Sequence, residues 1–261
     1  MTILDKIIAQ KKAEVAEAKK RVSAEELKQY PLFNRTCYSL RESIFHPGRT
    51  GIIAEFKRAS PSKGLINGSA AVQDVVKGYQ EAGASAVSVL TDPEFFKGSL
   101  ADLTAAREAL RLPLLRKEFV IDTYQIAEAK AYGADIILLI AACLSPGEVE
   151  ELACYAKDIG LNVLLEVHNE NELASNLSSS VDAIGVNNRN LKNFNVDLNH
   201  SYDLVGKIPE HYIKVSESGI ADPETINQLK KAGFNGFLIG ENFMKTEDPA
   251  AAIKEFSAQL K

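Results

Sequence analysis

The sequence predicts an α/β protein that folds as a single (β/α)8 TIM barrel with an N-terminal helical extension. Short apolar or β-branched runs recur at a mean step of about 26 residues, the combined length of a strand, a helix and two short loops. Helical patterns separate these runs, and the length of 261 residues suits a barrel of typically ~250 residues. The runs begin near Ile52, Ala86, Leu114, Ile136, Asn162, Ala183, Ile213 and Gly236.

The segments between the runs carry the signals of helices. Apolar residues recur there at helical spacing, as in Val72, Val75, Val76 and Tyr79. An open, doubly wound sheet is the alternative fold, but no glycine-rich nucleotide-binding turn follows the first run. Four of the helical segments end in a glycine shortly before the next run, as helix C-termini commonly do: Gly83, Gly133, Gly160 and Gly233.

Three helices are expected ahead of the first strand. Residues 3–15 place apolar side chains at helical spacing among lysines and glutamates, which indicates an amphipathic helix bracing the domain surface. Ser23 and Glu26 match a capping box at the start of a second helix, and a third is expected over residues 39–44. We therefore expect residues 1–47 to form a helical extension packed on the barrel, and residues 48–261 to form the (β/α)8 barrel catalytic domain.

Composition limits the class of protein. With 30 basic and 35 acidic residues the net charge is -5, which argues against broad nucleic-acid binding. No apolar run approaches the ~20 residues of a membrane span, and the first residues lack a secretory pattern. Cys37, Cys143 and Cys154 have no disulfide or zinc-site spacing. We expect a cytoplasmic protein with reduced thiols, no metal site and no membrane or nucleic-acid partner.

The first predicted strand carries charged residues at its C-terminal end. Glu55 and Lys57 alternate with Ala54 and Phe56, so both charges lie on one face of the strand. Desolvating a charge is costly unless the site pairs the charge or uses it. The strand alone leaves two interpretations open, a structural ion pair and a reactive pocket.

The other strand ends favour the reactive pocket. In a (β/α)8 barrel the chemistry lies at the C-terminal ends of the strands and in the loops that follow them. Several ionisable or amide groups converging on one rim are hard to explain as core packing. Besides Glu55 and Lys57, the polar strand ends are Thr91-Asp92, Arg116-Lys117-Glu118, Glu166, Asn187-Asn188-Arg189, Glu217-Ser218-Gly219 and Gly240-Glu241.

The last two strand ends predict a phosphate site. Ser218-Gly219 and Gly240-Glu241 supply small residues and backbone N–H groups after the seventh and eighth strands, where many barrels bind phosphate. Glycine lets backbone donors approach an anion closely. The alternative is that these glycines serve only the tight turns between strand and helix.

The charged rim suits proton transfer. Lys57, Lys117 and Arg189 share it with Glu55 and Glu166, and Glu217 is a further candidate acid. We expect neighbouring cations to make a lysine there easier to deprotonate. Arg189 suits a planar carboxylate. In the loops, Phe96 and Phe119 are candidates to sandwich an aromatic ring, although a single Phe is more often core packing.

Six separated motifs, in order and at barrel spacing, resemble those of the indole-3-glycerol-phosphate synthase family. The resemblance covers nearly the whole chain, including the N-terminal helical segment. The motifs are Ile53 to Gly64 (IAEFKRASPSKG), Leu90-Thr91 with Phe96 and Gly98-Ser99, Arg116 to Phe119 (RKEF), Leu165 to His168 (LEVH), Gly185 to Leu191 (GVNNRNL) and Glu217 to Ile220 (ESGI).

The resemblance implies a lyase of tryptophan biosynthesis. Its substrate would be 1-(2-carboxyphenylamino)-1-deoxyribulose 5-phosphate, and its products indole glycerol phosphate, carbon dioxide and water. Carried over by motif, Lys117 is the general acid at the ketone oxygen and Glu166 the general base of the dehydration. No cofactor is implied. The remaining implied site residues are Glu55, Lys57 and Asn187 for catalysis, Ser60, Phe96, Phe119, Arg189 and Leu191 for substrate binding, and Lys57, Ser218, Gly219, Gly240 and Glu241 for phosphate.

Residue 241 departs from the resemblance, because the family usually carries Ser where this chain has Glu. We expect its backbone N–H to donate to phosphate and its side chain to turn to solvent. Two other functions remain open at this point. A sister activity, phosphoribosylanthranilate isomerase or ribulose-phosphate epimerase, would keep the phosphate loops but would not need Lys57, Lys117 and Glu166 together. A barrel that binds the ligand as a scaffold or sensor would need no acid–base set.

Overall fold

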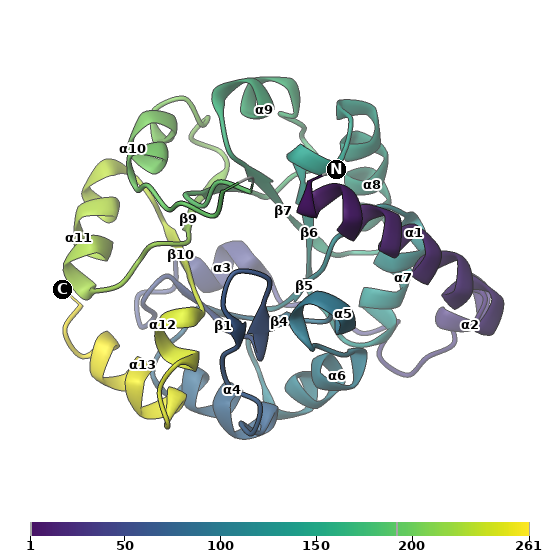
Figure 1. Ribbon diagram of the computed structural model, residues 1–261, viewed down its shortest axis with the longest axis horizontal. Helices are drawn as coiled ribbons and strands as arrows, with labels where there is room; N and C mark the ends of the chain where they lie inside the picture. Colours follow the sequence, from purple (N-terminus) through teal and green to yellow (C-terminus); the bar gives the residue numbers. More distant parts are fainter. Residues whose placement is uncertain (1, 192, 261) are drawn as a thin grey trace.

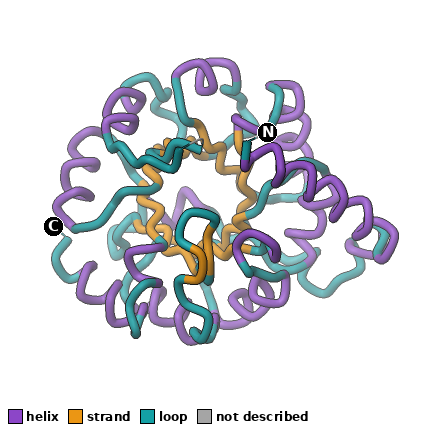
Figure 2. Tube along the Cα trace, viewed as in Figure 1, coloured by secondary structure: helices purple, strands orange, loops and turns teal. Residues whose placement is uncertain are grey.

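The computed structural model describes residues 2–191 and 193–260. Within them, eight parallel strands close into a barrel in the order β1-β10-β9-β8-β7-β6-β5-β4, with helices around the outside (Figures 1 and 2). The predicted (β/α)8 fold is confirmed, and every strand begins at the residue where its apolar run begins. The strands are β1 (Ile52–Phe56), β4 (Ala86–Leu90), β5 (Leu114–Lys117), β6 (Ile136–Ile140), β7 (Asn162–Val167), β8 (Ala183–Asn187), β9 (Ile213–Glu217) and β10 (Gly236–Ile239).

Side-chain alternation along the strands separates two apolar cores. Ile53 of β1 packs inside the barrel with Leu164 and Leu238, whereas Ile52 and Ala54 belong to the larger core between strands and helices. Because successive side chains point to opposite faces, Glu55 follows Ile53 toward the barrel axis. The face of β1 that points into the barrel is therefore apolar at the start of the strand and charged at its end.

Helices fill the connections, and their ends follow the sequence signals. The four predicted closing glycines all have left-handed backbone, with φ of +84° at Gly83, +97° at Gly133, +79° at Gly160 and +114° at Gly233. The helices outside the extension are α4 (Val72–Glu81), α5 (Pro93–Phe96), α6 (Leu100–Ala109), α7 (Thr123–Ala131), the 3-10 helix η1 (Ala141–Cys143), α8 (Pro146–Asp158), α9 (Glu170–Ser175), α10 (Asn199–Val205), α11 (Pro223–Ala232), α12 (Glu241–Met244) and α13 (Pro249–Ser257).

The N-terminal extension contains α1 (Ile3–Arg21), α2 (Ala24–Leu27) and α3 (Leu40–Ile44), as the sequence predicts. Ser23 and Glu26 form the expected capping box of α2. In Figure 1, α1 crosses the near side of the barrel and α3 lies behind it. Leu40 and Ile44 of α3 join the inner core, so α3 closes the N-terminal end of the barrel. Among the described residues, no helix is long and apolar enough to cross a membrane.

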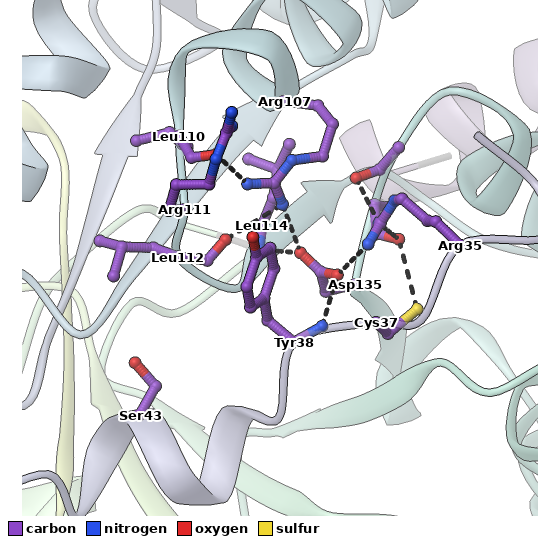
Figure 3. Close-up of polar contacts among 12 residues, drawn as sticks. Arg35, Cys37, Tyr38, Ser43, Arg107, Leu110, Arg111, Leu112, Leu114 and Asp135 are labelled. Atoms are coloured by element: carbon purple, nitrogen blue, oxygen red, sulfur yellow. Dashed lines mark hydrogen bonds and ion pairs between the residues drawn. The ribbon is translucent and has the colours of Figure 1, made fainter. Parts of the chain in front are cut away.

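A buried carboxylate ties the extension to the N-terminal end of the barrel. Asp135, fully buried before β6, accepts hydrogen bonds from Arg35 Nη1 at 2.6 Å and Arg107 Nη1 at 2.7 Å (Figure 3). It also accepts from the backbone N–H groups of Tyr38 and Leu114. One charge thus joins the segment after α2, helix α6 and strand β5, and removing it would leave two guanidinium groups without their partner.

A second buried ion cluster holds α1 at the opposite end. Lys11 is only 2% exposed, and its Nζ lies 2.5 Å from Glu14, 2.7 Å from Asp92 and 3.2 Å from Glu118. Asp92 also caps α5 by accepting from Phe95 and Phe96 N–H. Glu118 directly follows Lys117 in the chain. Lys11 therefore connects α1 to two loops that border the pocket described below.

The sequence did not predict the hairpin that follows β1. Strands β2 (Ala59–Ser60) and β3 (Gly64–Leu65) pair antiparallel in the segment directly after β1. Arg58 fixes the base of the hairpin by hydrogen bonds of 2.5 and 3.0 Å to Asp102 of α6. In Figure 1 the hairpin stands in front of the barrel beside β1.

Candidate active site

The ionic strand ends meet in one pocket at the C-terminal end of the barrel. All the residues predicted for catalysis and substrate binding line it, together with Ile3, Leu4 and Ile7 of α1. A second cavity of about 590 Å³ adjoins it and is lined by the residues predicted to bind phosphate. The predicted residues in the first pocket are Glu55, Lys57, Ser60, Phe96, Lys117, Phe119, Glu166, Asn187, Arg189 and Leu191.

Lys117 lies among carboxylates. Its Nζ is 2.7 Å from Oε2 of Glu217 and 3.4 Å from Oε2 of Glu166. Burial opposes the ammonium charge, but the carboxylates of Glu217, Glu166 and Glu55 outweigh burial and raise the pKa of Lys117 above its ordinary value. The expectation that neighbouring cations make this lysine easier to deprotonate is wrong here, because the groups nearest to it are anions. The side chain of Lys117 is therefore held in its ammonium form.

Glu166, at the end of β7, presents its two oxygens to different partners. Oε1 accepts a hydrogen bond from Asn187 Nδ2 at 3.0 Å, whereas Oε2 faces Lys117. Burial disfavours its charge, but Lys117 and His168 lower the pKa of Glu166 below its ordinary value. The carboxyl group is therefore ionised and able to accept a proton.

Glu217 was named from the sequence only as a further candidate acid, yet it is the nearest partner of Lys117. Its side chain is 1% exposed, and burial raises its pKa to about 7. Gly185 on β8 makes room for it, since a Cβ there would lie 2.2 Å from Glu217 Oε1. The carboxylate in the motif at the end of β9 was the available signal, but its contact with Lys117 arises only because the closed barrel places the end of β9 across from the end of β5.

Glu55 and Lys57, the charged pair at the end of β1, are in contact. Lys57 Nζ lies 2.8 Å from Glu55 Oε1, with the carboxylate 5% exposed and the lysine 16% exposed. Gly240 packs directly on this pair, because a Cβ there would lie 2.5 Å from Glu55 Oε1. The two charges therefore form an ion pair, and the pair lines the pocket.

One wall of the pocket is aromatic. The rings of Phe96 and Phe119 have centroids 6.2 Å apart and planes tilted by 40°. The rings contact each other in this structure, so the predicted sandwich would need them to part around a ligand ring. Ser60, Arg189 and Leu191 line the same pocket as the two rings.

The adjoining cavity has strained backbone at its edge. Ser218 and Gly219 have φ of +68° and +80°, and a left-handed conformation is unusual for serine. Gly240 and Glu241 line the cavity from the other side. The prediction that Glu241 turns to solvent is wrong: its side chain is 36% exposed and its oxygens lie 3.5 Å from Lys63 Nζ and 3.6 Å from Arg189 Nη2. The two flanking cations attract the carboxylate toward the cavity mouth.

The fold and the pocket together define the class of protein. It is a (β/α)8-barrel enzyme whose strand ends combine a protonated lysine, an ionised carboxylate and a neighbouring cavity bordered by cations. Such a set can protonate one atom of a substrate and deprotonate another within a single pocket.

Comparison with known proteins identifies the family. The family model described as indole-3-glycerol phosphate synthase matches residues 4–256. Relatives named indole-3-glycerol phosphate synthase include one from Bacteroides thetaiotaomicron, 47% identical, with 97% of each chain covered. One from Polaromonas sp. is 44% identical, again with 97% of each chain covered. A solved structure, the tryptophan synthase complex from Pyrococcus furiosus, shares only the fold, with a TM-score of 0.60 at 15% identity over 82% of this chain and 98% of that one.

The chain belongs to the indole-3-glycerol phosphate synthase family. Its activity is that of a carboxy-lyase of tryptophan biosynthesis, which closes the indole ring with loss of carbon dioxide and water.

Proposed function

We propose that Lys117 is the general acid of the ring closure. As the aromatic carbon bearing the carboxylate attacks the ketone carbon of the substrate, negative charge develops on the ketone oxygen. An ammonium group beside that oxygen would donate its proton to it, because the developing alkoxide is more basic than the ketone oxygen of the substrate. Carbon dioxide then leaves from the ring carbon that has formed the new bond, and the electron pair of the broken bond restores the aromatic ring.

Glu166 is the general base of the dehydration in this proposal. It removes a proton from the carbon next to nitrogen while the former ketone oxygen leaves as water. Asn187 holds Glu166 Oε1, which leaves Oε2 directed toward Lys117. Glu55 and Lys57, in contact at 2.8 Å, shuttle or stabilise protons on the opposite side of the pocket.

The remaining predicted residues bind the substrate. Phe96 and Phe119 enclose the aromatic ring, and Leu191 completes the apolar wall. Arg189 and Ser60 orient the carboxylate and the sugar hydroxyls. The phosphate occupies the adjoining cavity, where it contacts Ser218, Gly219, Gly240 and Lys57. The backbone N–H of Glu241 also donates to it.

One observation carries the proposal: Lys117 Nζ and Glu166 Oε2 lie 3.4 Å apart, with opposite charge, in the pocket that every predicted catalytic residue lines. The steady-state test follows indole fluorescence with purified protein and the carboxyphenylamino sugar phosphate. Lys117→Ala and Glu166→Gln should each lower kcat by ~100-fold or more with a modest change in KM. Near-normal turnover in either variant would remove that residue from its role.

We further propose a cytoplasmic monomer that acts on a diffusible anionic sugar phosphate. Its two parts would be residues 1–47, packed on the barrel, and residues 48–261, the barrel itself. The buried contacts of Lys11 and Asp135 support one cooperative unit, since each joins the extension to barrel loops. Light scattering of the purified protein tests the monomer, and a dimer mass would contradict it.

A further inference from the structure

His168 lies next to Glu166, the proposed general base, and has no role in the proposed mechanism. It follows β7, two residues after Glu166, and its side chain is 13% exposed. Nδ1 lies 3.2 Å from Glu172 Oε2, and Nε2 lies 3.4 Å from Glu166 Oε1. Among the described residues, Nε2 has no hydrogen-bond partner. A buried ring nitrogen directed at a carboxylate, without a settled hydrogen bond, is suited to exchange a proton with it.

A separate cavity leads from His168 to the protein surface. It measures about 470 Å³ and is lined by His168, Glu172 and His200, with the exposed residues Asn169 and Asn190 at its edge. Asn187, Arg189 and Leu191 line both this cavity and the catalytic pocket. The imidazole therefore stands between solvent on one side and Glu166 on the other.

The reaction consumes one proton from solvent in each turnover. The ketone oxygen takes up two protons to leave as water. One proton returns from the carbon next to nitrogen, and the departing carboxylate leaves as neutral carbon dioxide, so the second proton has no source in the substrate. This second proton must therefore come from solvent. It must reach acid groups at the strand ends, where the carboxylates are almost completely buried.

We propose that His168 is a positioning and proton-relay residue that supplies this proton to Lys117 through Glu166. The inference rests on the proposed roles of Lys117 and Glu166. The Nε2–H bond of the imidazolium breaks and an O–H bond forms at Glu166 Oε1. After the carboxyl group turns, that O–H bond breaks and an N–H bond forms at the neutral Lys117 amine. The neutral imidazole then takes a new proton from water in the cavity.

The surroundings of the ring favour its charged form. Glu166 on β7, Glu172 on α9 and Glu217 on β9 all act on it as carboxylates, and His200 of α10 lines the same cavity. Burial opposes the imidazolium, but the hydrogen bond that the ring donates to Glu172 and the charges of the three carboxylates raise the pKa of His168 above its ordinary value. Glu172 also accepts the backbone N–H of His168 at 2.8 Å, which fixes the ring between its two partners.

The test separates the first turnover from later ones. Wild-type Lys117 begins protonated, so carbon dioxide release in a single turnover needs no relay, whereas steady-state turnover does. His168→Gln should release labelled carbon dioxide from carboxylate-labelled substrate within about twofold of the wild-type rate, while steady-state kcat falls roughly 10-fold or more and KM changes little. Added imidazole should restore part of the lost kcat. His46→Gln is the matched control, because that exposed histidine lies on the segment between α3 and β1.

Each outcome decides the proposal. Equal slowing of both rates would assign His168 a structural role, and unchanged kcat would mean that the proton enters elsewhere; either result overturns the relay. Glu166→Gln is measured in parallel. If that variant keeps its turnover, the proposed function itself fails, whereas an inactive Glu166→Gln beside a normal His168→Gln contradicts the relay alone.

Discussion

The ammonium group of Lys117 lies 2.7 Å from Oε2 of Glu217, a carboxylate that is 1% exposed. The contact sets both the position and the charge of the proposed acid, because Glu217 is among the carboxylates that raise the pKa of Lys117. Glu217 reaches Lys117 across the barrel axis from β9 to β5, so two distant strands define this one donor.

Glu217→Gln should lower kcat by ~10-fold or more with little change in KM, because the neutral amide keeps the shape but no longer holds the charge of Lys117. Indole fluorescence measures both constants. Glu210→Gln is the control, since Glu210 pairs with Lys214 at 2.7 Å but is 94% exposed. Unchanged kcat in Glu217→Gln would limit Glu217 to a packing role.

Lys11→Met should destabilise the protein by about 3–5 kcal/mol, because Asp92 and Glu118 would be left buried without their shared cation. It should also raise KM, since α1 contributes Ile3, Leu4 and Ile7 to the pocket wall. Urea unfolding and steady-state kinetics check the two effects. The neighbouring exposed Lys12→Met is the control. A loss of stability with unchanged KM would contradict the link between α1 and the pocket.

Asp135→Asn should cost roughly 3 kcal/mol or more of unfolding free energy, because Arg35 and Arg107 lose their charged partner. The cluster in Figure 3 lies before β6, at the end of the barrel away from the pocket. The folded variant should therefore keep the wild-type kcat. Urea denaturation is compared with that of the exposed Asp158→Asn. A fall in kcat at full folding would contradict this separation of stability from activity.

The stability contributed by His168 should depend on pH. Its pKa is raised in the folded protein, so its contribution is fully present below the unfolded pKa and is lost as pH rises through the folded pKa. His168→Gln should thus cost more unfolding free energy at about pH 6 than at about pH 9. Urea unfolding of both proteins at the two pH values measures the difference. A cost that is equal, or larger at the higher pH, would contradict the raised pKa.

The strand pattern of the sequence was enough to predict the barrel. Apolar runs mark each strand start, and left-handed glycines mark four helix ends, because both depend on local backbone and side-chain periodicity. The hairpin Ala59–Leu65 was missed, since two-residue strands carry no periodic signal. The ion cluster of Lys11 was missed because its partners lie on elements distant in sequence.

The sequence predicted which residues line the pocket, but not their electrostatic surroundings. The sequence places Lys57, Lys117 and Arg189 on one rim, which suggested cations acting on one another. The register of the barrel instead puts Lys117 between Glu166 and Glu217. In the same way, Glu241 faces Arg189 and Lys63, which no local pattern indicates.

The central claim is that Lys117 acts before carbon dioxide leaves and Glu166 acts after it. A single-turnover experiment with carboxylate-labelled substrate follows labelled carbon dioxide and indole fluorescence together. In Glu166→Gln, carbon dioxide release should persist while indole formation falls by ~100-fold or more, and in Lys117→Ala both should fall. If Glu166→Gln instead slows carbon dioxide release as much as indole formation, the division of the two roles is contradicted.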